Sequence, residues 1–156
     1  MKRIKLLAVV LTAFTFAFSG CTKSNEELII GKWQVTRYIG NYTASGYSDE
    51  AMNTSETWDE APELSIVITF KEDNTVTSVQ TDTDGGEFSM DATYTLDGDK
   101  LTIKYAGYGD EGIEKYTITK LDKKEFRIRS SETFTEDYEG EEITIVYEET
   151  TVMKRL

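Results

Sequence analysis

Carboxylates supply most of the side chains in this sequence that could do chemistry. Residues 82–85 and 97–99 have the acidic spacing with which a calcium loop begins, but neither is followed at the right distance by the Glu that completes such a loop. Glu148 and Glu149 are neighbours, so on a strand they would face opposite sides and could not act together on one substrate atom. We therefore interpret these acids as turn residues and solvated side chains, and we predict no metal site.

Nucleophilic and redox chemistry has few candidates. The chain has no His, which removes the commonest general base and metal ligand. Ser130 and Ser131 have no His or Lys beside them in a recognisable nucleophile motif. The one Cys, Cys21, can form no disulfide within the chain. We predict that the protein is not an enzyme and uses no cofactor.

The charge balance is strongly acidic. The 17 basic and 29 acidic residues give a net charge of −12. Three of the basic residues, Lys2, Arg3 and Lys5, lie in the first 20 residues, which contain no acid, so the remainder is more acidic still. Proteins bind nucleic acids and anionic membrane surfaces through patches of basic residues, which an acidic surface lacks. We therefore expect no nucleic-acid partner. We also expect the protein to be a monomer.

The N-terminal segment has the layout of an export signal. Its basic start is followed at residues 6–18 by an apolar run of roughly 13 residues, too short for a spanning helix, which needs about 20. Small residues end the run at Ser19 and Gly20. We predict that residues 1–20 are a signal peptide that is removed.

Residues 18–21, Phe-Ser-Gly-Cys, resemble the lipobox of bacterial lipoproteins. The resemblance implies a lipidated Cys21 at the mature N-terminus, a polar tether over residues 21–27, and a membrane partner reached through the lipid. Thr22 is not the Asp that retains some lipoproteins at the inner membrane, so the resemblance implies an outer-membrane address, on the periplasmic face or the cell surface. An ordinary secretory signal followed by a buried Cys is the alternative.

The rest of the chain, residues 28–156, alternates between apolar and polar residues with a period of two, which favours antiparallel strands. Short turns keep successive strands adjacent, and closing such a sheet removes its open edges. We predict an all-β fold, an eight-stranded antiparallel up-and-down barrel, with a β-sandwich as the alternative. The polar residues 40–62 are expected to form a long mobile loop. The predicted strands are residues 32–39, 63–71, 75–81, 87–96, 100–105, 113–121, 125–134 and 143–155.

Large side chains fall on the predicted interior face. Arg37 shares the phase of Trp33 and Val35, so it either points inward, paired with Glu132 or an anionic ligand, or reaches water near the mouth. We select Arg37, Tyr94, Tyr105 and Tyr147 as candidate ligand contacts. The expected interior set is Trp33, Phe70, Phe88, Tyr94, Tyr105, Phe126 and Tyr147.

Three motifs resemble the lipocalins, and in particular the lipocalin-like lipoproteins of Bacteroidetes. They are Gly31-Lys32-Trp33 at the start of the first strand, the hairpin over residues 94–103, and residues 116–121. The resemblance implies a barrel that holds a small apolar ligand. It also implies that an Arg near the end of the last strand packs on the motif's Trp, a role that Arg155 matches. Gly31, Trp33 and Arg155 are therefore the predicted structural motif.

Two functions follow from this barrel. One is a binding protein for a small hydrophobic or amphipathic ligand, with residues 40–62 as a lid. The other is a non-enzymatic structural or interaction module with a solid barrel core. In either case we expect the last strand to pair with the first and to place Arg155 beside Trp33, because the ends of an eight-stranded meander run antiparallel.

Overall fold

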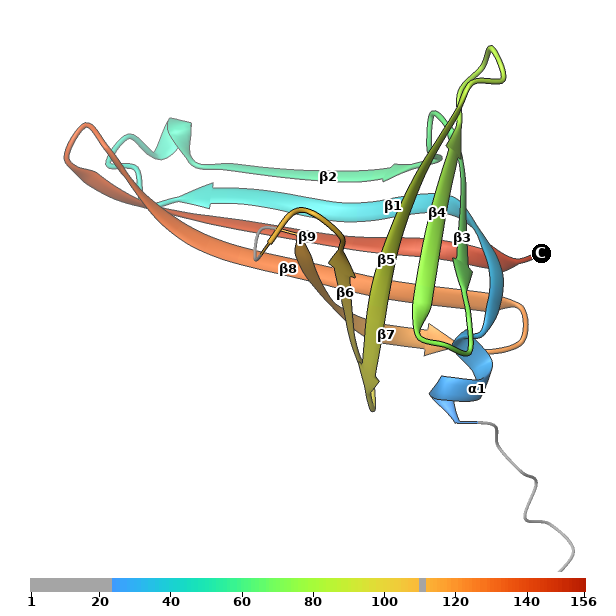
Figure 1. Cartoon of the computed structure of the whole chain (residues 1–156). Helices are drawn as coiled ribbons and strands as arrows, with labels where there is room; N and C mark the ends of the chain where they lie inside the picture. Colours follow the sequence, from blue (N-terminus) through green and yellow to red (C-terminus); the bar gives the residue numbers. More distant parts are fainter. Residues whose placement is uncertain (1–23, 110–111) are drawn as a thin grey trace, which may run out of the picture.

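The computed structural model describes residues 24–109 and 112–156, and it shows one antiparallel sheet with two short helices (Figure 1). The predicted signal peptide, residues 1–20, and Cys21 lie outside the described residues. The elements are α1 (Asn25–Ile29), β1 (Gly31–Ser45), the 3-10 helix η1 (Glu50–Met52), β2 (Thr54–Glu60), β3 (Ser65–Phe70), β4 (Thr75–Thr81), β5 (Glu87–Asp97), β6 (Lys100–Tyr105), β7 (Ile113–Leu121), β8 (Glu125–Tyr138) and β9 (Glu141–Arg155).

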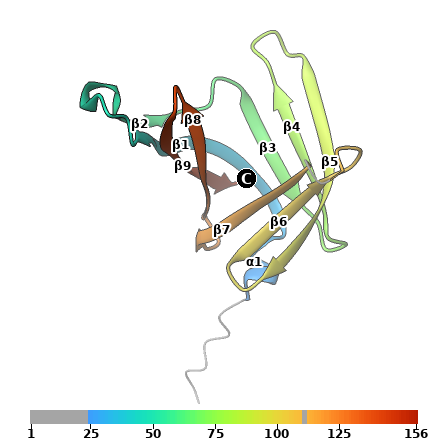
Figure 2. The ribbon, with the colours of Figure 1, turned by 90° about the vertical axis from the view of Figure 1, so that its left-hand side faces the viewer.

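The sheet closes into the predicted barrel. Its order is β2-β1-β3-β4-β5-β6-β7-β8-β9, and an additional pairing of β1 with β9 completes a ring of eight strands, with β2 as an extra strand outside it. Strands β3 to β7 curve round as one wall in Figure 2, and β8 and β9 return to β1. The barrel prediction is therefore confirmed, and the sandwich alternative is wrong because no second sheet is present among the described residues.

The first and last strands pair as expected. Trp33 lies opposite Arg155 in the antiparallel register, and the pairing continues as far as Ser45 opposite Thr144. The predicted closure is confirmed in both its direction and its register.

One end of the barrel is filled by side chains, and we call this cluster the floor. Trp33 lies 5.4 Å from Phe126 between ring centroids, and Phe70 lies 5.9 Å from Phe126 and 5.1 Å from Tyr94. Edge-to-face contacts of this kind add to the free energy gained from burial. The floor residues are Ile29, Trp33, Val35, Phe70, Val76, Ala92, Tyr94, Leu101, Ile103, Ile118, Phe126, Ile128 and Met153.

The prediction that residues 40–62 form a long loop is wrong. β1 continues to Ser45 because β9 supplies backbone partners along this whole length, and β2 pairs with the other side of β1. β8 and β9 are also longer than predicted and meet in a turn at Glu139 and Gly140, both with positive φ.

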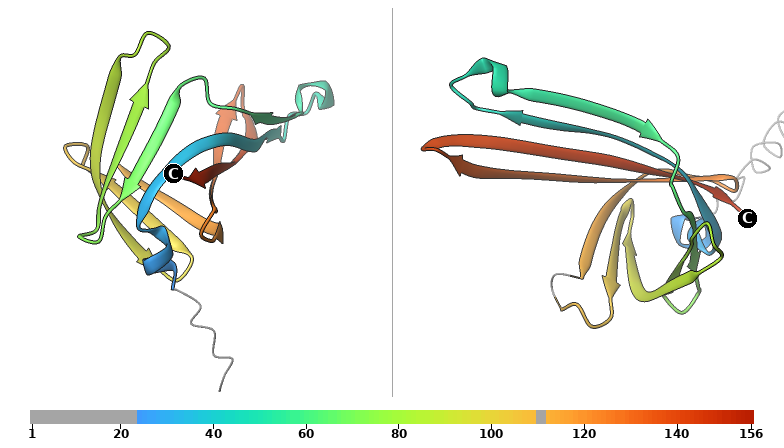
Figure 3. Two further views of the ribbon diagram at one scale, coloured as in Figure 1. Left: turned by 90° about the vertical axis from the view of Figure 1, so that its right-hand side faces the viewer. Right: turned by 90° about the horizontal axis from the view of Figure 1, so that it is seen from above.

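These extensions form a four-stranded arm that projects beyond the barrel (Figures 1 and 3). The arm consists of β2, residues 38–45 of β1, residues 130–138 of β8 and residues 141–151 of β9. Both of its faces are largely uncovered, so its sequence lacks the strong apolar alternation that marks a core strand.

A bulge in β1 separates the barrel from the arm. Val35 pairs with Met153 and Arg37 with Val152, so Thr36 has no opposing residue. The extra residue inverts the alternation of side chains along β1. As a result Arg37 points away from the face that carries Trp33 and Val35.

Candidate functional site

We call the face of each strand that continues the barrel interior the inner face, and the opposite one the outer face. The β8–β9 register is unbroken from Glu125 to Tyr138. Buried Phe126 therefore shares its face with Glu132 and Phe134, and buried Met153 shares its face with Tyr147. The inner face thus runs from the floor onto the arm without interruption.

Arg155 ties α1 to the barrel at the floor. Its guanidinium lies 5.0 Å from the Trp33 ring centroid, while Nη1 donates to the Leu28 carbonyl at 3.0 Å and Nη2 to the Ile30 carbonyl at 2.5 Å. Trp33 Nε1 donates to the Ile29 carbonyl at 2.8 Å. Gly31 has a φ of +135°, and a Cβ there would lie 2.7 Å from Arg155 Nη2, so this position needs glycine for two reasons. The three residues of the predicted motif are brought together.

Tyr94 belongs to the floor. Its side chain is buried, and its hydroxyl donates to the Lys71 carbonyl at 2.9 Å. Burial and then the charge of Asp73 raise the pKa of its phenol. The structure therefore gives Tyr94 a packing partner and a hydrogen-bond acceptor within the chain.

Tyr105 and Tyr116 meet on one carboxylate above the floor. Their hydroxyls donate to Glu114 Oε2 at 3.2 Å and 2.6 Å respectively. Burial and the charge of Glu114 raise the pKa of Tyr105 to about 12. Burial and the Glu114 hydrogen bond also raise the pKa of Tyr116, and the charge of Glu149, two strands away on β9, contributes to the same shift.

Tyr147 lies on the inner face of the arm. Its ring stacks on Trp58 of β2 at 5.3 Å between centroids with an interplanar angle of 32°, and its hydroxyl donates to Glu149 Oε2 at 3.0 Å. Burial, followed by Glu149, Glu132 and Glu60, raises its pKa to about 12. Tyr147 was expected in the closed interior, but 36% of it is exposed because it lies beyond the floor.

These groups define the mouth, the part of the inner face between the floor and the end of the arm. The mouth residues are Tyr38, Tyr105, Tyr116 and Tyr147 with Glu60, Glu114, Glu132 and Glu149. Burial raises the pKa of Tyr38, Tyr116 and Tyr147, and the charge of Glu149 contributes to each of these shifts.

Large aromatic side chains continue outward from the mouth. Phe134 is 43% exposed and Tyr138 is 47% exposed, both in the phase of the inner face of β8. Phe88, expected inside the barrel, is 58% exposed, because it lies at the open end of the β4–β5 hairpin. On the arm, Phe134 and Tyr138 thus keep part of their rings uncovered, although Tyr138 also contacts the Tyr47 ring edge-on at 5.8 Å between centroids, and partly uncovered rings offer an apolar surface to a ligand.

Arg37 does not enter the barrel. It forms a bidentate ion pair with Asp59 of β2 on the outer face, and both side chains are about half exposed. Glu132 is therefore not its partner. Arg37 does reach water, but on the outer face beside Asp59 and not near the mouth, as the second alternative had placed it. The Thr36 bulge explains the difference, because the predicted phase assumed a regular strand.

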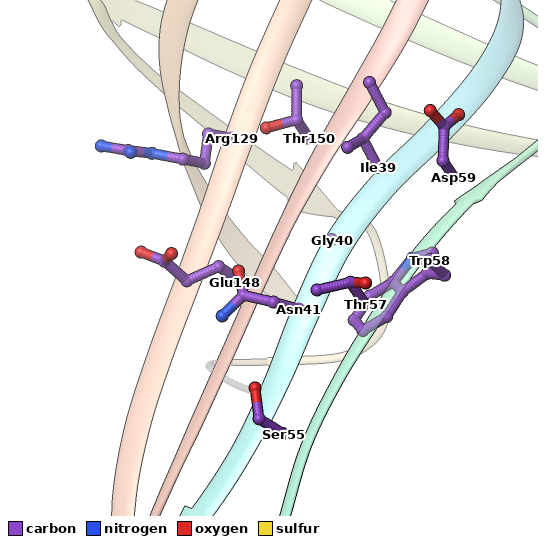
Figure 4. Close-up of a pocket in the computed structure, with 10 residues that line it drawn as sticks. All are labelled: Ile39, Gly40, Asn41, Ser55, Thr57, Trp58, Asp59, Arg129, Glu148 and Thr150. Carbon is purple, nitrogen blue, oxygen red and sulfur yellow. The ribbon is translucent and has the colours of Figure 1, made fainter.

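A separate groove of about 730 Å³ lies along the outer face of the arm (Figure 4). Asn41, Thr57 and Thr150 project from β1, β2 and β9 into it, with Asp59, Glu148 and Arg129 around them. The groove is open, and Ile39 and Trp58 line it beside the polar residues.

A second cavity, of about 600 Å³, lies where α1 meets the barrel. Arg155, Tyr94 and Leu96 line it together with Glu26, Glu27 and Glu72. The guanidinium that holds α1 therefore also faces this cavity.

The acidic turns have structural roles. Asp82 Oδ1 accepts hydrogen bonds from the backbone N–H groups of Asp84 at 2.9 Å and Gly86 at 2.7 Å. Within residues 24–109 and 112–156, no group of three His, Cys, Asp or Glu side chains is placed to hold a metal ion. In that same part of the chain no helix is long and apolar enough to cross a membrane.

Sequence reasoning missed Trp58 and Tyr116 as site residues. Glu56, Trp58 and Glu60 share one face of β2, and Trp58 was the available signal for a strand with an aromatic residue on that face. This signal was obscured because the neighbours of Trp58 on both faces of the strand are polar.

Comparisons with known proteins found one matching family model and several similar solved structures. A family model described as a lipocalin-like domain matches residues 29–128. Two solved structures are similar in fold: a lipocalin-like protein from Bacteroides uniformis, with 19% identity over 82% of this chain and 98% of that chain and a TM-score of 0.49, and an uncharacterized protein from Bacteroides eggerthii, with 17% identity over 81% and 98% and a TM-score of 0.46. A search of curated proteins gave no match.

Proposed function

Since the chain belongs to the lipocalin-like domain family, a binding fold that is generally not enzymatic, we propose that it is a cell-envelope lipoprotein that binds a small hydrophobic or amphipathic ligand at the mouth of its barrel. It acts as a monomer and catalyses no reaction. The ligand contacts are Tyr105 and Tyr147 from the sequence analysis, joined by Tyr116 and Trp58.

The observation that carries this proposal is the uncovered aromatic surface of the inner face. Trp58 and Tyr147 stack on each other, and Phe134 and Tyr138 are exposed on the neighbouring strand. Burying such side chains against an apolar ligand body is favourable by about 25 cal/mol per Å² of apolar surface removed from water. A ligand laid along this face would bury several of these rings at once.

The floor limits how deep the ligand enters. Trp33, Phe70 and Phe126 are each at most 2% exposed and fill the closed end. The ligand therefore rests on the floor and extends toward the arm, and the β1–β2 hairpin serves as a wall where a lid had been expected.

The acidic edge of β2 favours a monomer. β2 is the outermost strand of the arm, and it carries Glu56, Asp59 and Glu60. Charged side chains on an exposed edge oppose pairing with a second chain. Light scattering of the purified protein should give the mass of one chain.

The anchor is proposed at Cys21, with residues 1–20 removed and the protein held at the outer membrane. Its support is the apolar run that ends at Ser19-Gly20-Cys21. Metabolic labelling with a fatty-acid analogue should mark the wild type but not Cys21→Ser. Equal labelling of both would refute lipidation.

The binding proposal is tested on protein purified from its own cell envelope, by native mass spectrometry followed by solvent extraction. We expect a non-covalent adduct in addition to the mass of the chain and its anchor. Phe134→Ser should reduce the adduct, whereas Thr133→Ser, on the outer face of the same strand, should retain it. A wild-type protein that never carries an adduct would contradict the proposal.

The second candidate is an interaction module with a solid core. The packed floor favours it, because the barrel stands without a ligand. Under this alternative the inner face of the arm would be covered by another macromolecule, and no small molecule would be recovered with the protein.

A further inference from the structure

Acidic residues lie on both faces of the strands, but the basic residues of the described strands lie on the outer face with one exception. Arg37, Arg127 and Arg129 lie on the outer face, as do Lys104 and Lys154. The alternation fixed by the register places carboxylates on the inner face. These are Glu56, Glu60, Glu114, Glu132, Glu136, Glu141 and Glu149.

One basic side chain reaches the inner face of the described strands, and it is already engaged. Arg155 lies at the floor, where it contacts Trp33 and donates to the carbonyls of Leu28 and Ile30. The Thr36 bulge turns Arg37 outward, toward Asp59. The mouth therefore has no basic side chain among the described strand residues.

The mouth carboxylates take no part in the ion pairs of the described residues. Those pairs join Arg37, Lys100, Lys120 and Arg127 to outer-face or turn acids. Glu114 and Glu149 instead accept hydrogen bonds from tyrosine hydroxyls. Like charges gathered on a partly enclosed surface repel one another, and a bound cation would relieve that repulsion.

The tyrosines give this surface a preference among cations. Rings of Tyr and Trp attract ammonium groups through their faces, most strongly where water is excluded. A hydrated metal ion requires a shell of oxygen ligands in place of rings. The combination of carboxylates with Trp58, Tyr116 and Tyr147 therefore fits a weakly hydrated organic cation.

We propose that the ligand of the mouth is an amphiphile with an organic ammonium head, whose charge lies among Glu132, Glu149 and Tyr147 and whose apolar body packs on the exposed aromatic rings. This rests on the proposed binding function and names the class of its ligand. Glu132 lies directly opposite Tyr147 in the β8–β9 register, and the Tyr147 hydroxyl donates to Glu149 Oε2 at 3.0 Å.

The test uses the full lipidated chain in nanodiscs of zwitterionic lipid, with empty nanodiscs as the blank. Three probes share one short alkyl body: hexyltrimethylammonium, hexyl glucoside and hexyl sulfate. Calorimetry measures the affinity of each. We expect the ammonium probe to bind about tenfold more tightly than the neutral probe, and the sulfate probe most weakly, with the difference shrinking as salt is added.

Conservative variants show which carboxylates produce the preference for the ammonium probe. Glu149→Gln and Glu132→Gln should each lower the ammonium affinity toward that of the neutral probe, with a much larger loss for the ammonium probe than for the neutral one. Glu148→Gln is the matched control, because Glu148 adjoins Glu149 on β9 but faces the outer groove. It should leave all three affinities unchanged.

The outcomes separate the two proposals. Equal binding of all three probes, or equal loss in Glu148→Gln and Glu149→Gln, would overturn the ammonium preference and leave the binding function standing. No binding of any probe would overturn both.

Discussion

Arg155 joins three parts of the molecule through one side chain. It covers the Trp33 ring, bonds to two carbonyls at the end of α1, and occupies the space beside Gly31. The terminal carbonyls of a helix have no partners within the helix, so a guanidinium that reaches them satisfies groups that burial would otherwise leave unpaired.

Trp33→Ala should lower the free energy of unfolding by about 3–5 kcal/mol, because it removes a fully buried ring from the floor. Arg155→Ala should cost clearly less, and Arg155→Lys less again, since Lys retains the charge over the ring. Urea unfolding measures all three. An Arg155→Ala variant as unstable as Trp33→Ala would show that the contribution of the Trp33 ring to stability depends on its contact with the guanidinium rather than on burial.

The mouth tyrosines should make the protein sensitive to alkali. The pKa of Tyr105 and of Tyr147 is raised to about 12, above the ordinary value of about 10. The folded state therefore holds these protons more tightly than the unfolded state. This contribution to stability is complete below about pH 10 and is lost as the pH rises toward 12.

Phenolate absorbance during an alkaline titration checks this expectation. The folded protein should show a late phase that Tyr105→Phe and Tyr147→Phe each reduce, and the protein in urea should show no such phase. Folded and unfolded curves that coincide would contradict the burial of these phenols.

The first strand shows what could and could not be predicted from the sequence. The alternation along the chain and the antiparallel ends of an eight-stranded meander were enough to predict the closure, whereas the packing of Arg155 on Trp33 was implied by the resemblance to the lipocalins. The bulge at Thr36 left no mark, because no Gly or Pro signals it. One extra residue then moved Arg37 to the other face.

The arm was missed for a different reason. Periodicity identifies a strand by its buried face, and the arm has no face that is fully buried. In residues 54–60 both alternating sets are polar apart from Trp58, so no apolar face marks the strand. The mouth carboxylates could therefore not be placed together before the register of β2, β8 and β9 was known.

Gly40→Val should loosen β2. A Cβ at Gly40 would press on the Trp58 ring and lie 2.5 Å from the Glu148 carbonyl oxygen. Moving Trp58 removes its stack on Tyr147, so proteases should cut residues 46–60 faster while the urea midpoint of the barrel changes little. Thr57→Val, on the outer face of the same hairpin, is the control. An unchanged cleavage pattern in Gly40→Val would contradict the role of this contact.

The molecule combines a packed floor with an open arm, and β9 serves both. Its final residues pair with β1 and β8 at the floor, while its first residues form the centre of the arm. The rigid packing of the floor against the last residues of β9 thus positions the mouth residues that lie further back along the same strand.

Deletion of residues 152–156 should open the β1–β9 pairing and expose two strand edges. We expect a lower melting temperature and aggregation visible by light scattering. Removal of Leu156 alone should have little effect, since it is 63% exposed. A truncated protein that melts like the wild type would show that β8 and the arm suffice to hold β9.

The central claim is that the inner face of the mouth is the binding surface. A crystal structure of the protein with the compound recovered from its own envelope tests it most directly. We predict that the compound lies against Tyr147 and Trp58, with its head beside Glu149. A compound seated in the outer groove with Asn41 and Thr57, or in the cavity between α1 and Arg155, would contradict the claim.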